Sequence, residues 1–237
     1  MNTLLFKDLG RMDYQAACAI QESLLEVKQS ASLPDILLLV EHPHVFTIGR
    51  SGKEANVLCP AEVPVCRASR GGDVTYHGPG QVVAYPLLDL RSKLRRDVHR
   101  YLRGVERTLI RTLDSFGVGG DRKPPWTGVW VGERKIASIG VAVRRGITCH
   151  GAALNVNTDL AYFRRIVPCG LAWARMTSIQ RENGKEVSMN RVKERFLAHF
   201  MEEFRYLEHK ELCREDIRIG SRSDFPAAPA ISTSSGS

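Results

Sequence analysis

The segment from Val129 to Val156 constrains the fold more than any other part of the chain. Three apolar runs follow one another at about 127–131, 136–143 and 147–156, separated only by residues 132–135, with a turn at Gly132-Glu133, and by Arg144-Arg145-Gly146. Strands joined by turns this tight are antiparallel neighbours. A doubly wound fold would instead need a helix between consecutive strands. The pattern therefore predicts an α+β fold with a mixed, mostly antiparallel sheet flanked by helices.

Other periodic segments predict the elements around this sheet. Apolar residues recur at helical spacing from Asp13 to about Lys28, from Asp97 to Phe116 and from about Asn190 to Tyr206. Strands are expected at 36–40, 45–49, 62–67 and 81–88, with Leu4-Leu5-Phe6 as an edge strand and 123–126 as a loop. Residues 1–213 are expected to form one domain. Residues 214–237 form a C-terminal extension, and its Ser-, Ala- and Pro-rich part from about 221 is predicted to be disordered.

Charge and cysteine content restrict the partners and the compartment. The net charge of +8 favours an acidic partner, although few aromatic residues interleave with the basic ones, which disfavours nucleic acid. The six cysteines form no Cys-x-x-Cys pair and no signal peptide precedes them, so a reducing, cytoplasmic setting without a zinc site is expected. The longest aliphatic run, 36–40, is too short to span a membrane. His42 and His44 flank a proline and lack a third ligand nearby, so no metal site is predicted.

A glycine-rich stretch, Arg70 to Gln81, is the first candidate for a binding site. It holds four glycines, a histidine, an arginine and an aspartate within a short polar run between predicted strands. Glycine lets the backbone approach a ligand closely, because no Cβ intervenes. The alternative is an ordinary hairpin loop in which His77 has no role.

Cys169 is the candidate nucleophile. It lies in a Pro-Cys-Gly turn, whereas the other cysteines are expected inside strands or helices as small hydrophobic residues. A nucleophilic cysteine needs a nearby cation or base to favour the thiolate. Lys135, at the start of an apolar strand, is one candidate, and His77 and His150 are others. A lysine at a strand end can also simply point into solvent.

Basic residues gather before and within the helix expected at 97–116. They are Arg91, Lys93, Arg95, Arg96, Arg100, Arg103, Arg107 and Arg111. Two interpretations stay open: a solvated helix face or a docking surface for an acidic partner.

Three ordered blocks resemble the lipoyl(octanoyl) transferase family. They are Arg70–Gln81, Gly132–Gly140, and His150–Asn157 together with Pro168-Cys169-Gly170. Thr127–Trp130 and Thr177–Ile179 fit as well, so that the resemblance covers about residues 5–205. It implies the fold of biotin and lipoate ligases, with 1–213 as the catalytic domain.

The resemblance also implies an activity and the residues that perform it. An octanoyl group would move from acyl carrier protein to a lysine of lipoyl domains, in 2-oxoacid dehydrogenases and in the glycine cleavage H protein, as the first step of endogenous lipoylation. The cysteine matching Cys169 carries the acyl thioester, and the lysine matching Lys135 favours its thiolate and assists proton transfer. The implied substrate-binding residues are Arg70, Gly71, Gly72, Asp73, Val74, Thr75, Tyr76, His77, Ser138, Ile139, Gly140, Gly151, Ala152 and Ala153. No cofactor or membrane is implied, and a monomer is expected.

Rival functions on the same fold remain open at this point. An ATP-dependent lipoate or biotin ligase would need a motif that binds the triphosphate. The chain has no P-loop, and Asp73–Tyr76 occupies the place where a basic Gly-Arg-Gly-Arg loop would be expected. The other rivals are a thioesterase and a non-catalytic protein that binds lipoyl domains.

Overall fold

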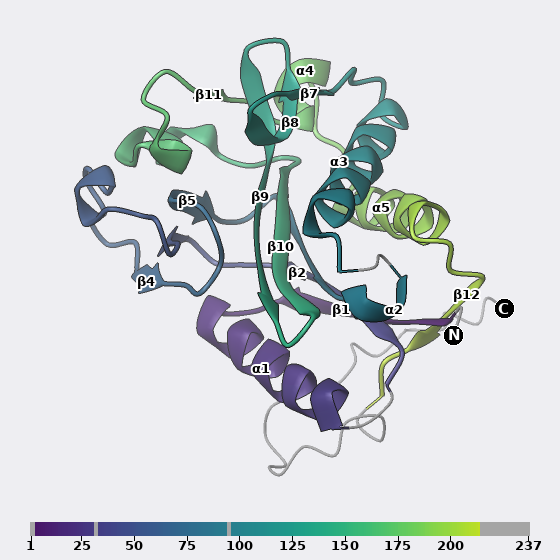
Figure 1. The fold of residues 1–237 in the computed structure, drawn as a ribbon. Coiled ribbons are helices and arrows are strands. Elements are labelled where there is room, and N and C mark those ends of the chain that lie inside the picture. Colours follow the sequence, from purple (N-terminus) through teal and green to yellow (C-terminus); the bar gives the residue numbers. More distant parts are fainter. Residues whose placement is uncertain (1–2, 31–32, 94–95, 214–237) are drawn as a thin grey trace, which may run out of the picture.

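A large sheet forms the centre of the protein in a computed structural model that describes residues 3–30, 33–93 and 96–213 (Figure 1). Its strands run in the order β12-β1-β2-β6-β10-β9-β8-β7, with β11 beside β9. They are β1 Thr3–Arg11, β2 Asp35–Glu41, β6 Gln81–Leu87, β7 Asp121–Lys123, β8 Trp126–Val131, β9 Arg134–Arg144, β10 Ile147–Asn155, β11 Arg175–Met176 and β12 Glu208–Glu211. β1 is parallel to β2 and β12, β11 is parallel to β9, and the other neighbours are antiparallel. The predicted α+β class with a mixed, mostly antiparallel sheet is confirmed.

The strand succession that led to this prediction is present in β8, β9 and β10. Both turns use backbone with positive φ, at Gly132 (φ 55°) and at Arg145-Gly146 (φ 50° and 87°). These turns pair each strand with the next in antiparallel register, for example Gly151 opposite Gly140. Local turn chemistry thus sets the middle of the sheet.

Three details of the strand prediction were wrong. Leu4-Leu5-Phe6 is not at the edge, because β12, about two hundred residues later, pairs with it. Residues 123–126 are not a loop throughout, since Lys123 ends β7 and Trp126 begins β8. The strand expected at 62–67 is shortened to β4, Val65–Arg67. The sequence signals fail here because β7 and β12 are short and polar. Pairing with the next strand, β8, stabilises β7, and pairing with the distant β1 stabilises β12.

Helices cover both faces of the large sheet (Figure 1). α1 (Tyr14–Ser30) packs on one face, and α3 (Val98–Asp114) and α5 (Met189–Glu203) pack on the other. Two short helices, α2 (Leu90–Lys93) and α4 (Ile179–Asn183), complete the set in the described residues. Asp13 and Asp97 cap α1 and α3, because each side chain accepts backbone N–H groups of the first turn.

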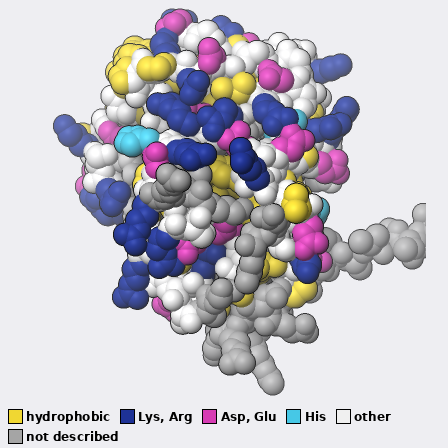
Figure 2. All heavy atoms as spheres, turned by 45° about the vertical axis from the view of Figure 1, so that its right-hand side comes forward, with side chains coloured by type: hydrophobic (Ala, Val, Ile, Leu, Met, Phe, Trp, Pro, Cys, Tyr) yellow, Lys and Arg dark blue, Asp and Glu magenta, His cyan; other side chains and the backbone are white. Residues whose placement is uncertain are grey.

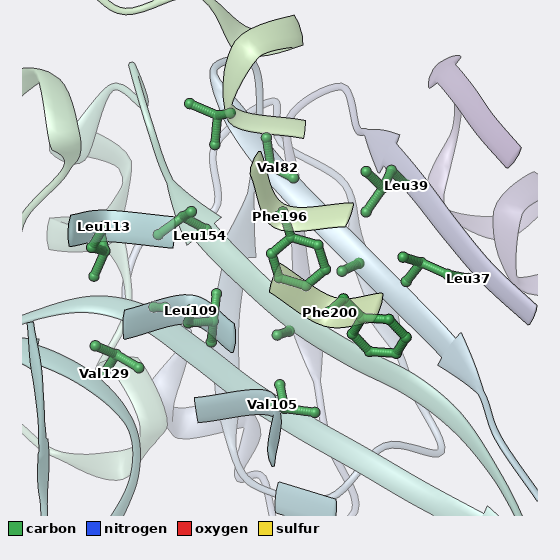
Figure 3. Packing of buried hydrophobic residues seen from close by; sticks show 14 of the residues in the cluster. Leu37, Leu39, Val82, Val105, Leu109, Leu113, Val129, Leu154, Phe196 and Phe200 are labelled. Carbon is green, nitrogen blue, oxygen red and sulfur yellow. The ribbon is translucent and has the colours of Figure 1, made fainter. Parts of the chain in front are cut away.

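β2 is buried on both faces, which explains its continuous apolar run. Leu37 and Leu39 point toward α3 and α5, where Leu109 and Phe196 belong to the same cluster (Figure 3). The alternate residues Ile36, Leu38 and Val40 pack against α1 instead.

A second, three-stranded sheet lies beside the large one and helps to form the site. It contains β4, β3 (Val45–Ile48) and β5 (Val74–His77), and its apolar face packs against the 3₁₀ helix η2 (Leu160–Arg165). η1 (Glu54–Asn56) and η3 (Pro168–Gly170) are shorter 3₁₀ turns. Among the described helices, none combines the length and apolarity that crossing a bilayer requires. The tail predicted to be disordered lies outside the described residues.

Candidate active site

A cavity of about 430 Å³ opens where the small sheet, the glycine-rich stretch and strands β9 and β10 meet. Cys169, Lys135 and most of the residues implied by the family resemblance lie in its wall. Those wall residues are Arg70, Gly71, Gly72, Asp73, Thr75, His77, Ser138, Ile139, Gly140, Gly151, Ala152 and Ala153. Segments that are far apart in the sequence therefore converge on one site.

Val74 and Tyr76 do not line this cavity, contrary to the expectation that they bind substrate. Side chains alternate along β5, so Thr75 and His77 face the cavity whereas Val74 and Tyr76 face the opposite side. There both pack with Phe46 in a buried apolar cluster. Their side chains therefore belong to the core of the small sheet.

Lys135 and Cys169 are in direct contact. The Nζ atom of Lys135 lies 3.3 Å from Sγ of Cys169 and donates to the carbonyl oxygen of Thr127 at 3.0 Å. Its ammonium also lies 5.4 Å from the ring centroid of buried Trp130, within range of a cation–π attraction. Lys135 is only 3% exposed. The expectation of a solvent-facing lysine at a strand end is therefore excluded by its burial.

The backbone explains why these two residues meet. β11 follows η3 by a few residues and pairs in parallel with the start of β9, with Met176 opposite Lys135. A further hydrogen bond joins the Thr177 N–H to the Lys135 carbonyl oxygen at 2.9 Å. Gly128 leaves the necessary room, because a Cβ there would lie 2.7 Å from Cε of Lys135.

Cys169 adopts a backbone conformation that is unusual for a residue with a side chain. Its φ is 58° and ψ is 21°, and Gly170 follows with φ 69°. The turn is closed by the Leu171 N–H, which donates to the Pro168 carbonyl oxygen at 3.0 Å. Left-handed backbone at a non-glycine residue costs energy and is enriched at functional sites.

The other cysteines divide into two groups, which corrects one expectation. Cys18, Cys66 and Cys149 lie in α1, β4 and β10 as expected, and burial raises the pKa of Cys18 to about 11. Cys59 and Cys213, however, are exposed and lie outside helices and strands. Position in a loop therefore does not single out Cys169, whereas contact with Lys135 does.

Glycines at the site let neighbouring backbone segments approach each other closely. The Gly71 N–H donates to the Val141 carbonyl oxygen at 2.9 Å, and a Cβ on Gly140 would lie 3.0 Å from the Gly71 oxygen. A Cβ on Gly151 would lie 2.1 Å from the Ala84 oxygen. The glycine-rich stretch thus docks against the open side of β9, and the paired Gly140 and Gly151 keep the cavity floor free of side chains.

Arg70 anchors the glycine-rich stretch from beneath. Its guanidinium donates to the hydroxyl and the carbonyl oxygen of Thr47 and to the carbonyl oxygen of Gly71. Burial lowers the pKa of Arg70 from its ordinary value, but an arginine remains charged. The site therefore contains two buried cations, Arg70 and Lys135.

Buried histidines and tyrosines lie in and behind the cavity wall: Tyr14, His77, Tyr85 and His150 line it, and His42 packs behind them. His77 bonds to Gln81 through Nδ1 at 2.8 Å and stacks on Tyr14 at a centroid distance of 5.9 Å. His42 bonds to Met12 O and Tyr85 OH, at 2.7 Å each. Burial lowers the pKa of His77 to about 3 and that of His42 to about 4. Burial, followed by the charge of Arg70, lowers the pKa of His150 to about 4.

These histidines should make the fold sensitive to mild acid. In the unfolded chain they titrate near 6.5, so the unfolded state binds more protons than the folded state between about pH 6.5 and pH 4. Stability is therefore fully present above pH 6.5 and decreases as the pH falls below it. We expect the free energy of unfolding to drop by of order 5 kcal/mol from pH 7 to pH 5, since each histidine contributes up to about 1.4 kcal/mol per pH unit. Urea unfolding at pH 7 and at pH 5 measures this difference. Equal free energies of unfolding at the two pH values would contradict the conclusion that the histidines are neutral in the folded protein.

The structure also shows how His42 and His44 are used. His42 is fully buried in the bonds just described, and His44 bonds to Tyr76 OH at 2.7 Å. Across the described ranges, no group of three or more His, Cys, Asp or Glu side chains is placed to hold a metal ion.

Most arginines of α3 are paired with acids of the same chain. Arg103 pairs with buried Glu106 at 2.6 Å, Arg107 with Glu203 at 2.5 Å, and Arg111 with Glu202. Figure 2 shows acidic side chains interleaved with the basic ones on the side that carries α3 and α5. The local positive charge is therefore smaller than the sequence run indicates. The side chains of Lys93 and Arg95 lie outside the described residues.

Several wall residues were not identified from the sequence. Tyr14 begins α1, Leu102 lies on α3, Tyr85 on β6, and Trp126 precedes Thr127 at the mouth. Tyr14, Leu102 and Tyr85 also fit an ordinary amphipathic or strand pattern, and Trp126 lies in a segment expected to be a loop, so periodicity alone could not identify them as site residues. Thr127 belongs to a block that fits the family, and this match was the one sequence signal that pointed to this part of the wall.

Comparisons with known proteins identify the family of this chain. Residues 13–201 match the family model of the lipoyl protein ligase A/B catalytic domain. The octanoyltransferase of Solibacter usitatus is 48% identical over 206 residues, which cover 84% of this chain and 92% of that protein. The octanoyltransferase of Citrifermentans bemidjiense is 50% identical over 198 residues, with 83% and 95% covered.

Solved structures share the fold at much lower identity. A bi-partite lipoate protein ligase from Thermoplasma acidophilum superposes with a TM-score of 0.67 at 18% identity, over 90% of this chain and 88% of that one. Biotin protein ligase from Aquifex aeolicus has a TM-score of 0.51 at 15% identity, with 85% and 70% covered. The extent of the family match and the identity of the relatives show that the chain belongs to the lipoyl protein ligase A/B catalytic-domain family, among the octanoyltransferases.

Proposed function

We propose that the protein transfers an octanoyl group from octanoyl-acyl carrier protein to the target lysine of lipoyl domains, through a thioester on Cys169. The observation that carries this proposal is the 3.3 Å contact between Lys135 Nζ and Cys169 Sγ in the cavity wall. The acceptors are the lipoyl domains of 2-oxoacid dehydrogenases and the glycine cleavage H protein. We further propose that 1–213 forms the catalytic domain.

The first half-reaction exchanges one thioester for another. The Cys169 thiolate, stabilised by the Lys135 ammonium, attacks the donor thioester carbonyl. The carrier thiol leaves and takes a proton from Lys135, so that the acyl-enzyme holds a neutral lysine. Because bonds of the same kind break and form, no ATP is needed.

The second half-reaction forms the amide. The acceptor lysine, an ammonium at neutral pH, gives one proton to neutral Lys135 and attacks the acyl carbonyl as an amine. A second proton goes to solvent as the amide forms, and Cys169 leaves as the thiolate beside the restored Lys135 ammonium. The floor at Gly140, Gly151 and Ala153 has little or no side chain, which leaves room for a straight acyl chain.

Intact-mass spectrometry after mixing the protein with octanoyl-carrier protein, without acceptor or ATP, tests this proposal. The expected result is a gain of one octanoyl group, mapped to Cys169 by peptide analysis. Addition of an unmodified lipoyl domain should then discharge it. An ATP requirement would favour the ligase, and hydrolysis at an equal rate with and without acceptor would favour a thioesterase.

A substitution of Arg100 tests whether the acyl donor is an acidic protein that docks near α3. Arg100 is exposed, and within the part of the chain that the structure describes it makes no ion pair. α3 also places Leu102 in the cavity wall, so this helix lies near the mouth. We expect Arg100→Glu to lower kcat/KM for the carrier donor by about threefold at low salt, and less at physiological ionic strength, where the Debye length is about 8 Å.

Two comparisons make that measurement specific. Octanoyl-CoA lacks most of the carrier's surface charge, so its kcat/KM should change little. Arg191→Glu makes the same charge change on α5, which contributes no residue to the cavity wall. Equal effects of the two substitutions on the carrier would show that only net charge matters.

A further inference from the structure

Asp73 places a carboxylate beside the turn that carries Cys169. It lines the same cavity as Cys169 and Lys135. A Cβ on Gly170 would lie 2.7 Å from its Oδ2 atom, so Oδ2 is within about 4 Å of the Gly170 Cα atom. Cys169 is the preceding residue, one Cα step of about 3.8 Å away. The carboxylate is therefore within reach of a group that approaches the Cys169 thioester.

The hydrogen bonds of Asp73 leave part of this carboxylate available. Oδ1 accepts the N–H groups of Val74 at 2.7 Å and of Lys53 at 3.3 Å, while Asn56 Nδ2, at 2.7 Å, is the only donor to Oδ2 among the described residues. A carboxylate oxygen can accept two hydrogen bonds. No basic side chain of the described residues lies within ion-pair distance of Asp73, and the residue is only partly buried. One side of Oδ2 can thus bind a donor from outside the chain.

The charges of the reactants indicate what that donor is. A carboxylate near Cys169 disfavours the thiolate by repulsion, so it contributes nothing to the first half-reaction. The octanoyl chain is uncharged. The acceptor lysine is the reactant that arrives with a positive charge at neutral pH, and its nitrogen must come to the carbonyl carbon held on Cys169.

We propose that Asp73 forms the subsite for the acceptor's ammonium group, a primary alkylammonium, in the second half-reaction. The proposal rests on the proposed function. Asp73 holds the ammonium beside the acyl-enzyme until a proton passes to the neutral Lys135. Asp73 is thus a specificity-determining residue for a cationic amine, and Asn56 orients its carboxylate.

The test measures the discharge of preformed octanoyl-enzyme by two small nucleophiles at pH 7. Butylamine is a cation at this pH, whereas methoxyamine is neutral. Asp73→Asn keeps the shape of the side chain, and its amide can be accommodated if the Asn56 amide rotates. We expect this variant to lose about 10-fold in the rate with butylamine and less than twofold with methoxyamine. With an unmodified lipoyl domain, the KM for the acceptor should rise by a similar factor.

Two controls separate charge from structure. Asn56→Ala removes the bond to Oδ2 but keeps the carboxylate, and it should retain the preference for butylamine. If the Asp73→Asn variant fails to fold, Asp73→Ser replaces it in the same comparison, because serine keeps a hydrogen-bond acceptor near the Val74 N–H. Equal losses with both nucleophiles, or no loss with either, would overturn the subsite. Failure of the wild-type protein to form an acyl-enzyme would instead reject the proposed function.

Discussion

Replacing Cys169 with alanine should abolish acyl-enzyme formation and reduce octanoyl transfer by about 10³-fold or more, because the covalent intermediate cannot form. The fold should be unaffected. Alanine also has a Cβ, so the left-handed backbone at φ 58° is no more strained than with cysteine. Intact mass with octanoyl-carrier protein, together with a thermal melt, measures both outcomes.

The remaining cysteines supply the matched controls for this result. Cys59 and Cys213 are exposed, so Cys59→Ala and Cys213→Ala should each retain full transfer. Octanoylation mapped to either of them in the Cys169→Ala protein, with transfer preserved, would refute the assignment of Cys169 as the nucleophile.

Lys135→Met should slow the alkylation of Cys169 by iodoacetamide at neutral pH by about 10-fold or more. The ammonium at 3.3 Å stabilises the thiolate, and a thioether of similar length does not. Peptide mapping is needed because exposed Cys59 and Cys213 also react. Equal alkylation rates at Cys169 in the two proteins would contradict the ion-pair mechanism.

Lys135→Arg separates charge from proton transfer. Arginine keeps the positive charge but does not become neutral, so the variant should form acyl-enzyme and then transfer poorly to the acceptor. The space is limited, since Gly128 lies against the lysine side chain. A variant that is slow in both half-reactions would therefore require the melting temperature to be compared before its kinetics are interpreted.

Local sequence patterns were sufficient for most of the helices and for the middle of the sheet. The turns at Gly132 and at Arg145-Gly146 act over a few residues, and they alone pair β8, β9 and β10. The caps Asp13 and Asp97 are equally local. The ordered blocks around Arg70, Lys135 and Cys169 indicated the family, since their residue types and order can be recognised without coordinates.

Tertiary structure decided which of these residues meet. Lys135 reaches Cys169, 34 positions later, because β11 pairs with β9, and a two-residue strand has no periodicity that a sequence could display. The arginines of α3 pair with Glu202 and Glu203 about ninety positions away, so the basic run is partly neutralised. Pairing, burial and charge compensation between distant segments depend on how the chain packs, whereas turns, caps and motifs depend only on neighbouring residues.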